Sequence, residues 1–221
     1  MNILIFFCHV LLVVLSGWGA LRLGKSTLVA WVSLQAVMAN LFVVKQMNML
    51  SYQVTCGDVF IIGSMLGVNF LQEFFDKKEA KKATKTCFFC MVFFTCMSII
   101  HLNYVPSPAD HTQLAFETIL KPSFRLTIAS IITFLIVQRI DIFIFSLLQS
   151  FSLPFFLRSA ASLIISQLID TLLFTFLGLY GYVASVKDVI VLSFCIKVFV
   201  ILCMIPLTIF TKKIIRQHDK N

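Results

Sequence analysis

The sequence predicts an all-α integral membrane protein, a polytopic helical bundle of about seven (six to seven) transmembrane helices. Two bulk properties support this fold class: 59% of the 221 residues are hydrophobic, and the mean hydropathy is +0.96. A soluble chain of this length could not solvate so much apolar surface. The third observation is that the basic residues stand in short segments beside long apolar runs. We therefore expect a single transmembrane domain over residues 1–221.

Seven apolar runs are long enough to span a bilayer, which requires about 20 mostly apolar residues. They are residues 2–21, 26–45, 56–75, 87–105, 123–148, 157–181 and 189–210. The first run lacks the basic n-region and the cleavage site of a signal peptide, so we expect residues 1–25 to form an extra N-terminal helix. Residues 105–110 are rich in turn-forming residues and predict a loop, and residues 111–120 favour a short interfacial helix.

The basic residues orient the bundle. Arg22 and Lys25 follow the first run, five lysines lie between residues 77 and 85 after the third, and the basic tail 211–221 follows the seventh. If the spans alternate, these segments share one side of the membrane. The positive-inside rule then places that side, with the C-terminus, in the cytoplasm of a multi-pass inner (plasma) membrane protein. The net charge of +8 is explained in this way and does not indicate a nucleic-acid partner.

Two of the apolar runs carry the same polar signature, offset by 29 positions. The first is Ser130, Gln138, Asp141 and Phe145, and the second is Ser159, Gln167, Asp170 and Phe174. Each set lies on one face of a helix. Because the two spans run antiparallel across a short connection, we expect the faces to line one polar cavity at similar depth. A buried acid marks a ligand, ion or proton site by default; the alternative is that these groups only hydrogen-bond the helices together.

Further polar residues stand in apolar runs, among them Asn69, Gln72 and Glu73 in the third. Asn69 and Glu73 are four apart and share a face of the third span, where Glu73 lies near the cytoplasmic end. It is predicted either to contribute to the site or to pair with a nearby lysine. Lys197 stands alone in the seventh span and needs an acidic partner, with Asp141, Asp170 and Glu73 as the candidates. A structural pair and a coupling role both fit this lysine.

The sequence contains no motif for catalysis or for a cofactor. It has no phosphate-binding G-x4-G-K-[ST], no H-E-x2-H and no G-x-S-x-G. The seven cysteines lie mostly within apolar runs and are interpreted as buried hydrophobes. Cys87-x2-Cys90 lacks a second pair or a nearby histidine, which argues against a metal site. Gly63-x3-Gly67 is a small-x3-small pattern typical of helix packing. We expect no enzyme activity, cofactor or metal.

Short blocks between roughly residues 26 and 210 together point to one family. They are Ala39–Lys45, Asn69-x3-Glu73 followed by 76–83, Pro106-Ser107-Pro108, Arg125-x4-Ser130-x7-Gln138-x2-Asp141, Leu157–Ser162, Ser166–Thr171 with Phe174, and Ile196-Lys197. These blocks resemble the queuosine precursor transporters, also called the vitamin uptake transporter family. The chain departs from the family pattern at Val68, Asn69, Phe75 and Asp76, and Asp58 stands where Asn is frequent.

The resemblance implies import of 7-deazaguanine precursors of queuosine (preQ0, preQ1 or queuine). A guanine-like edge presents two donors beside a carbonyl, so a carboxylate can accept both donors while an amide serves the carbonyl. The expected substrate-binding residues are Asn69, Glu73, Gln138, Asp141, Ser162, Gln167, Asp170 and Phe174, and the expected coupling or structural charges are Lys45, Arg125, Arg158 and Lys197. The expected partners are a small deazapurine base and the lipid bilayer, and a homo-oligomer is allowed.

Other functional classes stay open at this point. The chain could be the substrate-binding subunit of a multi-component vitamin or nucleobase uptake system with a separate ATPase. An integral membrane enzyme and an assembly factor are further alternatives. Acids on facing helices, without a nucleophile and base beside them, favour the transporter.

Overall fold

The fold is a bundle of long helices. The computed structural model describes residues 2–43, 45–49, 52–55, 57–121, 124–181 and 186–208. Its elements are α1 (Asn2–Arg22), α2 (Lys25–Phe42), β1 (Gln46–Met49), β2 (Tyr52–Thr55), α3 (Asp58–Phe74), α4 (Lys77–Leu102), α5 (Gln113–Leu120), α6 (Phe124–Gln149), α7 (Phe155–Phe174), the π-helical turn η1 (Thr175–Leu179) and α8 (Val186–Thr208). The predicted all-α membrane fold is confirmed, and each expected span corresponds to a helix.

Two of these helices are shorter than the sequence predicts. In the described part of the chain, α1, α4, α6, α7 with η1, and α8 are long and apolar enough to cross a membrane. By contrast, α2 has 18 residues and α3 has 17. The facing ends of the runs 26–45 and 56–75 lie outside these helices, because α2 ends at Phe42 and α3 begins at Asp58. Between them, β1 pairs antiparallel with β2, with Gln46 opposite Thr55. The predicted interfacial helix is present as α5.

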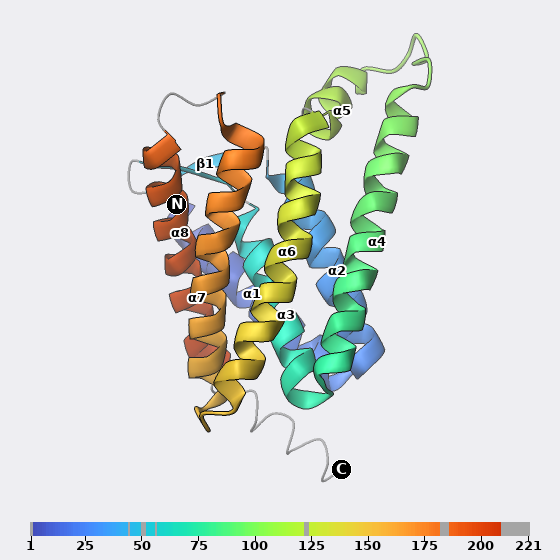
Figure 1. Cartoon of the computed structure of the whole chain (residues 1–221). Helices are drawn as coiled ribbons and strands as arrows, with labels where there is room; N and C mark the ends of the chain where they lie inside the picture. Colours follow the sequence, from blue (N-terminus) through green and yellow to red (C-terminus); the bar gives the residue numbers. More distant parts are fainter. Residues whose placement is uncertain are drawn as a thin grey trace.

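The long helices alternate in direction (Figure 1). The connections from α1 to α2, α3 to α4 and α6 to α7 lie at the lower end of the view, and β1 and α5 lie at the upper end. Arg22, Lys25 and Lys77, which flank these lower connections, are therefore at one end of the bundle, as their spacing predicts. The tail 211–221 lies outside the described residues. Asp76 begins α4 as an N-cap, since its Oδ1 accepts from the Glu79 backbone N–H at 2.8 Å.

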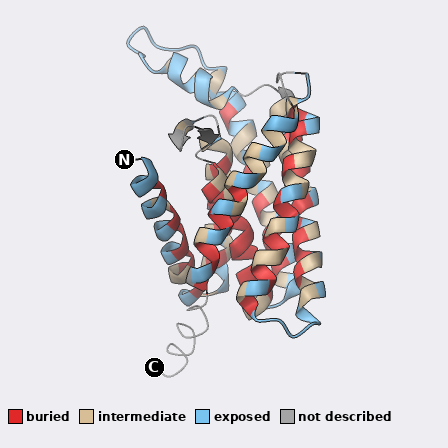
Figure 2. Cartoon of the chain, turned by 90° about the vertical axis from the view of Figure 1, so that its left-hand side faces the viewer, coloured by how far each residue is buried: buried red, intermediate tan, exposed pale blue. Residues whose placement is uncertain are grey.

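The core is built around α3, which packs against α1, α2, α4, α6, α7 and α8. Buried residues face the inside of the bundle in Figure 2, whereas the outer face of α1 is exposed. A Cβ at Gly67 would lie 2.4 Å from Val32 Cγ2, and one at Gly63 would lie 2.7 Å from Val13 Cγ1. These approaches need glycine, so the small-x3-small pattern serves packing, as predicted.

Candidate functional site

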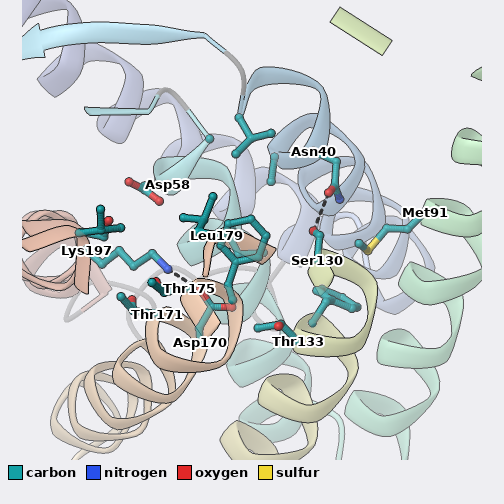
Figure 3. A pocket seen from close by; sticks show the side chains of 18 residues that line it. Asn40, Asp58, Met91, Ser130, Thr133, Asp170, Thr171, Thr175, Leu179 and Lys197 are labelled. Carbon is teal, nitrogen blue, oxygen red and sulfur yellow. Dashed lines mark hydrogen bonds and ion pairs between the residues drawn. The ribbon is translucent and has the colours of Figure 1, made fainter. Parts of the chain in front are cut away.

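A pocket of about 180 Å³ lies in the upper half of the bundle, between α2, α3, α4, α6, α7, η1 and α8. Figure 3 shows its lining. The polar groups on its walls are Asn40, Asp58, Ser130, Thr133, Asp170, Thr171, Thr175, Ser193 and Lys197. The rings of Phe134 and Phe174 also line it. The pocket therefore combines charged groups, neutral hydrogen-bonding groups and aromatic surface in one small space.

One wall of the pocket carries charge. Lys197 Nζ donates to Asp170 Oδ2 in an ion pair whose two side chains are 9% and 16% exposed. Asp58, at the start of α3, also interacts electrostatically with Lys197. With all three groups ionised, this wall has one excess negative charge. It therefore favours a ligand that offers hydrogen-bond donors or a positive charge.

The opposite wall is neutral. Ser130 Oγ donates to Asn40 Oδ1 at 2.8 Å, and Asn40 Nδ2 donates to the Ala36 carbonyl at 3.1 Å. Thr133 is 1% exposed, and its Oγ1 has no hydrogen-bond partner among the described residues. A hydroxyl so placed can donate to a ligand carbonyl or accept from a ligand N–H.

A π-helical turn shapes the upper edge of the pocket. Thr175 and Leu179 of η1 line the pocket. A Cβ at Gly178 would lie 3.2 Å from Leu126 Cδ2 and 3.3 Å from Ala129 Cβ, so this turn packs closely on α6. The π-helical turn continues α7 at its upper end and changes which of its last side chains face the neighbouring helices.

A second polar region lies below the pocket. Asp141 is 0% exposed, and it accepts hydrogen bonds from Ser162 Oγ and, at 3.1 Å, from Ser166 Oγ. Gln167 is also completely buried, and its Nε2 donates to Met65 Sδ at 2.8 Å. Gln138, one turn before Asp141 on α6, has no hydrogen-bond partner among the described residues. The contacts of Asp141 join α6 to α7, and the contact of Gln167 joins α7 to α3.

Ser130 of the first signature and Asp170 and Phe174 of the second line the same pocket, but the expectation that both aspartates lie in it at similar depth is wrong. Asp170 lines the pocket, but Asp141 does not. Asp141 lies eight residues before the lower end of α6, whereas Asp170 lies fifteen residues after the lower end of α7. At a rise of about 1.5 Å per residue the two carboxyls differ in height by about 10 Å. Equal spacing along antiparallel helices therefore does not give equal depth.

A buried ion pair closes the lower end of this polar region. Arg158 Nη2 donates to Glu73 Oε2 at 2.6 Å, and the side chains are 6% and 9% exposed. The guanidinium also lies 5.1 Å from the centre of the Phe145 ring. The acid of α3 is thus held by an arginine of α7, whereas the sequence suggested a lysine as its charge partner.

The expected site residues fall into separate groups. Asp170, Phe174 and Lys197 lie at the pocket, while Asn69, Gln138, Asp141, Ser162 and Gln167 lie in the buried region below it. Lys45 is exposed after α2, and the side chain of Arg125 lies outside the described residues. Whether any of them binds a substrate stays a prediction.

Sequence reasoning missed several residues that line the pocket. Asn40 stands in one of the blocks that carry the family resemblance, and Asp58 stands where the family frequently has Asn. Both positions could therefore have been recognised in the sequence as candidates for the site. Thr133 and Thr175 gave no signal, because threonines are common in helices of this kind.

A family model described as "Putative vitamin uptake transporter" matches residues 55–211. The "Probable queuosine precursor transporter" of Bacillus subtilis (strain 168) is 29% identical over 205 residues, which cover 90% of this chain and 89% of the relative. No solved structure matches the chain significantly.

Proposed function

The chain belongs to the vitamin uptake transporter family and is a multi-pass membrane transporter, and on that premise we propose that it imports 7-deazaguanine precursors of queuosine (preQ0, preQ1 or queuine) for tRNA modification. The relative in Bacillus subtilis carries the corresponding name. The proposed role is transport of a small deazapurine base by this chain, and not catalysis.

The pocket is the observation that supports this cargo. Asp170 can accept the ring N–H and the exocyclic amine of a guanine-like edge in a bidentate pair. Thr133 Oγ1 or Asn40 can complete the pattern at the carbonyl, and the Phe134 or Phe174 ring offers a surface for stacking. The excess negative charge beside Lys197 suits a precursor that bears an amine.

Uptake into cells tests the cargo. Cells that express the chain should accumulate labelled 7-deazaguanine base, and unlabelled guanine-type bases should compete. A 7-deazaadenine base presents a different order of donors and acceptors. It should compete at least about ten-fold more weakly, because each unpaired buried polar group costs about 1–3 kcal/mol. Equal competition by the two base types would contradict recognition through this edge.

We propose further that the pocket faces the outside in this conformation. It lies at the end of the bundle opposite the basic connections, which the positive-inside rule assigns to the cytoplasm.

Cysteine labelling tests this orientation. In a background without native cysteines, Lys81→Cys on α4 should resist an impermeant thiol reagent in intact cells. Asp110→Cys, in the loop beyond α4, is the matched control and should react readily. The opposite pattern of labelling would invert the proposed orientation.

A further inference from the structure

Asp141 differs from Glu73 and Asp170 in its charge environment. Glu73 is paired with Arg158, and Asp170 is paired with Lys197. Asp141 is completely buried, and no lysine, arginine or histidine of the described residues forms an ion pair with it. Its only described side-chain partners are two serine hydroxyls, which donate to Oδ1, and Oδ2 has no partner among the described residues. A buried carboxylate in that position needs a bound cation or a proton.

Further buried polar groups stand on α6 itself and on the helices that pack against it, α3 and α7. Ser159, Ser162 and Ser166 are spaced by three and four on the face of α7 that contacts α6. Asn69 lies on α3 between Met65, which accepts from Gln167, and Gln72, which donates to the Ile142 carbonyl of α6. The buried polar cluster comprises Asn69, Gln138, Asp141, Ser159, Ser162, Ser166 and Gln167. Its members Asn69, Gln138 and Ser159 are buried, and none of their side-chain polar atoms has a described partner.

The buried polar cluster lies between two charged regions. Above it, Gln167 is one turn before Asp170 at the pocket, and below it Ser159 follows Arg158 directly. Unpartnered buried polar atoms of this kind are normally satisfied by ordered water. Polar side chains with water between them can conduct a proton, which needs donors and acceptors in sequence and little space.

Charged and titratable groups stand on each element that packs against α6. They are Arg158 and Asp170 on α7, Glu73 and Asp58 on α3, and Lys77, Lys78, Glu79, Lys81, Lys82, Lys85 and His101 on α4. Of these, Lys77, Lys81 and Lys85 line a separate cavity with Arg139 of α6. The turn η1 has no ionisable side chain. Arg158, Asp170 and Glu73 already have charge partners, so none of these three neutralises Asp141.

We propose that Asp141 is the proton-coupling site of the transporter, separate from the substrate pocket. This inference rests on the proposed function and specifies its energy source. A proton that arrives from water on the pocket side forms an O–H bond to Asp141 Oδ2. When that O–H bond breaks, the proton passes to water on the cytoplasmic side. Both serine hydroxyls are directed to Oδ1, so Oδ2 is the oxygen left to take the proton.

The test uses Asp141→Asn in the full-length protein in proteoliposomes. Asparagine keeps the size of the side chain and resembles a permanently protonated aspartate. The wild-type protein should concentrate labelled 7-deazaguanine base when the proton gradient is directed inward. The variant should lose this accumulation at least ten-fold but keep exchange of labelled for unlabelled base within about three-fold. Asp110→Asn, an exposed acid-to-amide control, should retain both activities.

Each other outcome has a defined meaning. The proposal would be overturned if Asp141→Asn still accumulates the base. It would also be overturned if the folded variant loses both exchange and accumulation. If the variant does not fold, the wild-type protein decides: addition of base should change the pH inside liposomes that contain a trapped indicator, and no change would overturn it. Accumulation that follows a sodium gradient instead would also overturn it. Absence of both exchange and accumulation in the wild-type protein would reject the proposed cargo, not the coupling site.

Discussion

Asp170→Asn should reduce uptake of the 7-deazaguanine base by about 100-fold or more. Hydrogen bonds to a charged acceptor contribute about 1.5–3 kcal/mol each, and the amide cannot accept both donors of the ligand edge. The protein should still fold, because Lys197 retains its electrostatic interaction with Asp58. The measurement is initial uptake, normalised to the amount of protein in the membrane. Asp110→Asn serves as the control with the same chemical change at an exposed position.

The ion pair at Asp170 can be separated from its role in binding by a double-mutant cycle. Lys197→Met should lower the amount of folded protein, because it leaves Asp170 partly buried without its cation. Combining it with Asp170→Asn should restore folded protein but not uptake. Normal uptake by Asp170→Asn would remove the role of Asp170 in binding. Additive effects of the two substitutions on the amount of folded protein would remove the structural role of the Asp170–Lys197 pair.

Glu73→Gln should destabilise the protein by about 3 kcal/mol or more, because breaking a buried ion pair leaves an unpaired charge behind. The Arg158 side chain is only 6% exposed, so it cannot reach water without rearrangement of α7. The measurement is the free energy of unfolding in detergent micelles. Glu73→Gln combined with Arg158→Met should recover part of the loss, since no charge is then buried alone.

Lys25→Met is the matched control for this buried pair. Lys25 forms a pair with Glu79 at 3.3 Å, but its side chain is 48% exposed. Exposed pairs contribute at most about 1 kcal/mol, so this change should have a small effect. Equal losses for Glu73→Gln and Lys25→Met would contradict a special role for burial at the Arg158–Glu73 pair.

The helices were predictable because the hydrophobic signal is local. A run of apolar residues identifies a buried or membrane helix without any knowledge of its neighbours. The family resemblance, drawn from short blocks, is confirmed by the comparisons. The antiparallel pair β1 and β2 was missed, since two four-residue strands between apolar runs leave little signal. The two strands lie between α2, which ends inside its apolar run, and α3, which begins inside the next.

The site was predicted only in part, because contacts between helices depend on vertical offset. The repeated signature identified Asp141 and Asp170 as unusual, and in the fold Asp141 is completely buried and Asp170 is partly buried. Their spacing could not show that one carboxyl contacts serines of α7 and the other a lysine of α8. The role of Asp58 likewise requires the packing of α3 against α8, which no local pattern encodes.

The most direct test of the proposed cargo is recovery of queuosine in tRNA. A host that cannot make queuosine and lacks its own importer receives this gene and a low dose of a 7-deazaguanine precursor, and the modified nucleoside is measured in its tRNA. We expect the wild-type chain to restore the modification and Asp170→Asn to fail, with both proteins present in the membrane. Unmodified tRNA in cells whose membranes contain the folded wild-type protein would contradict the proposed cargo.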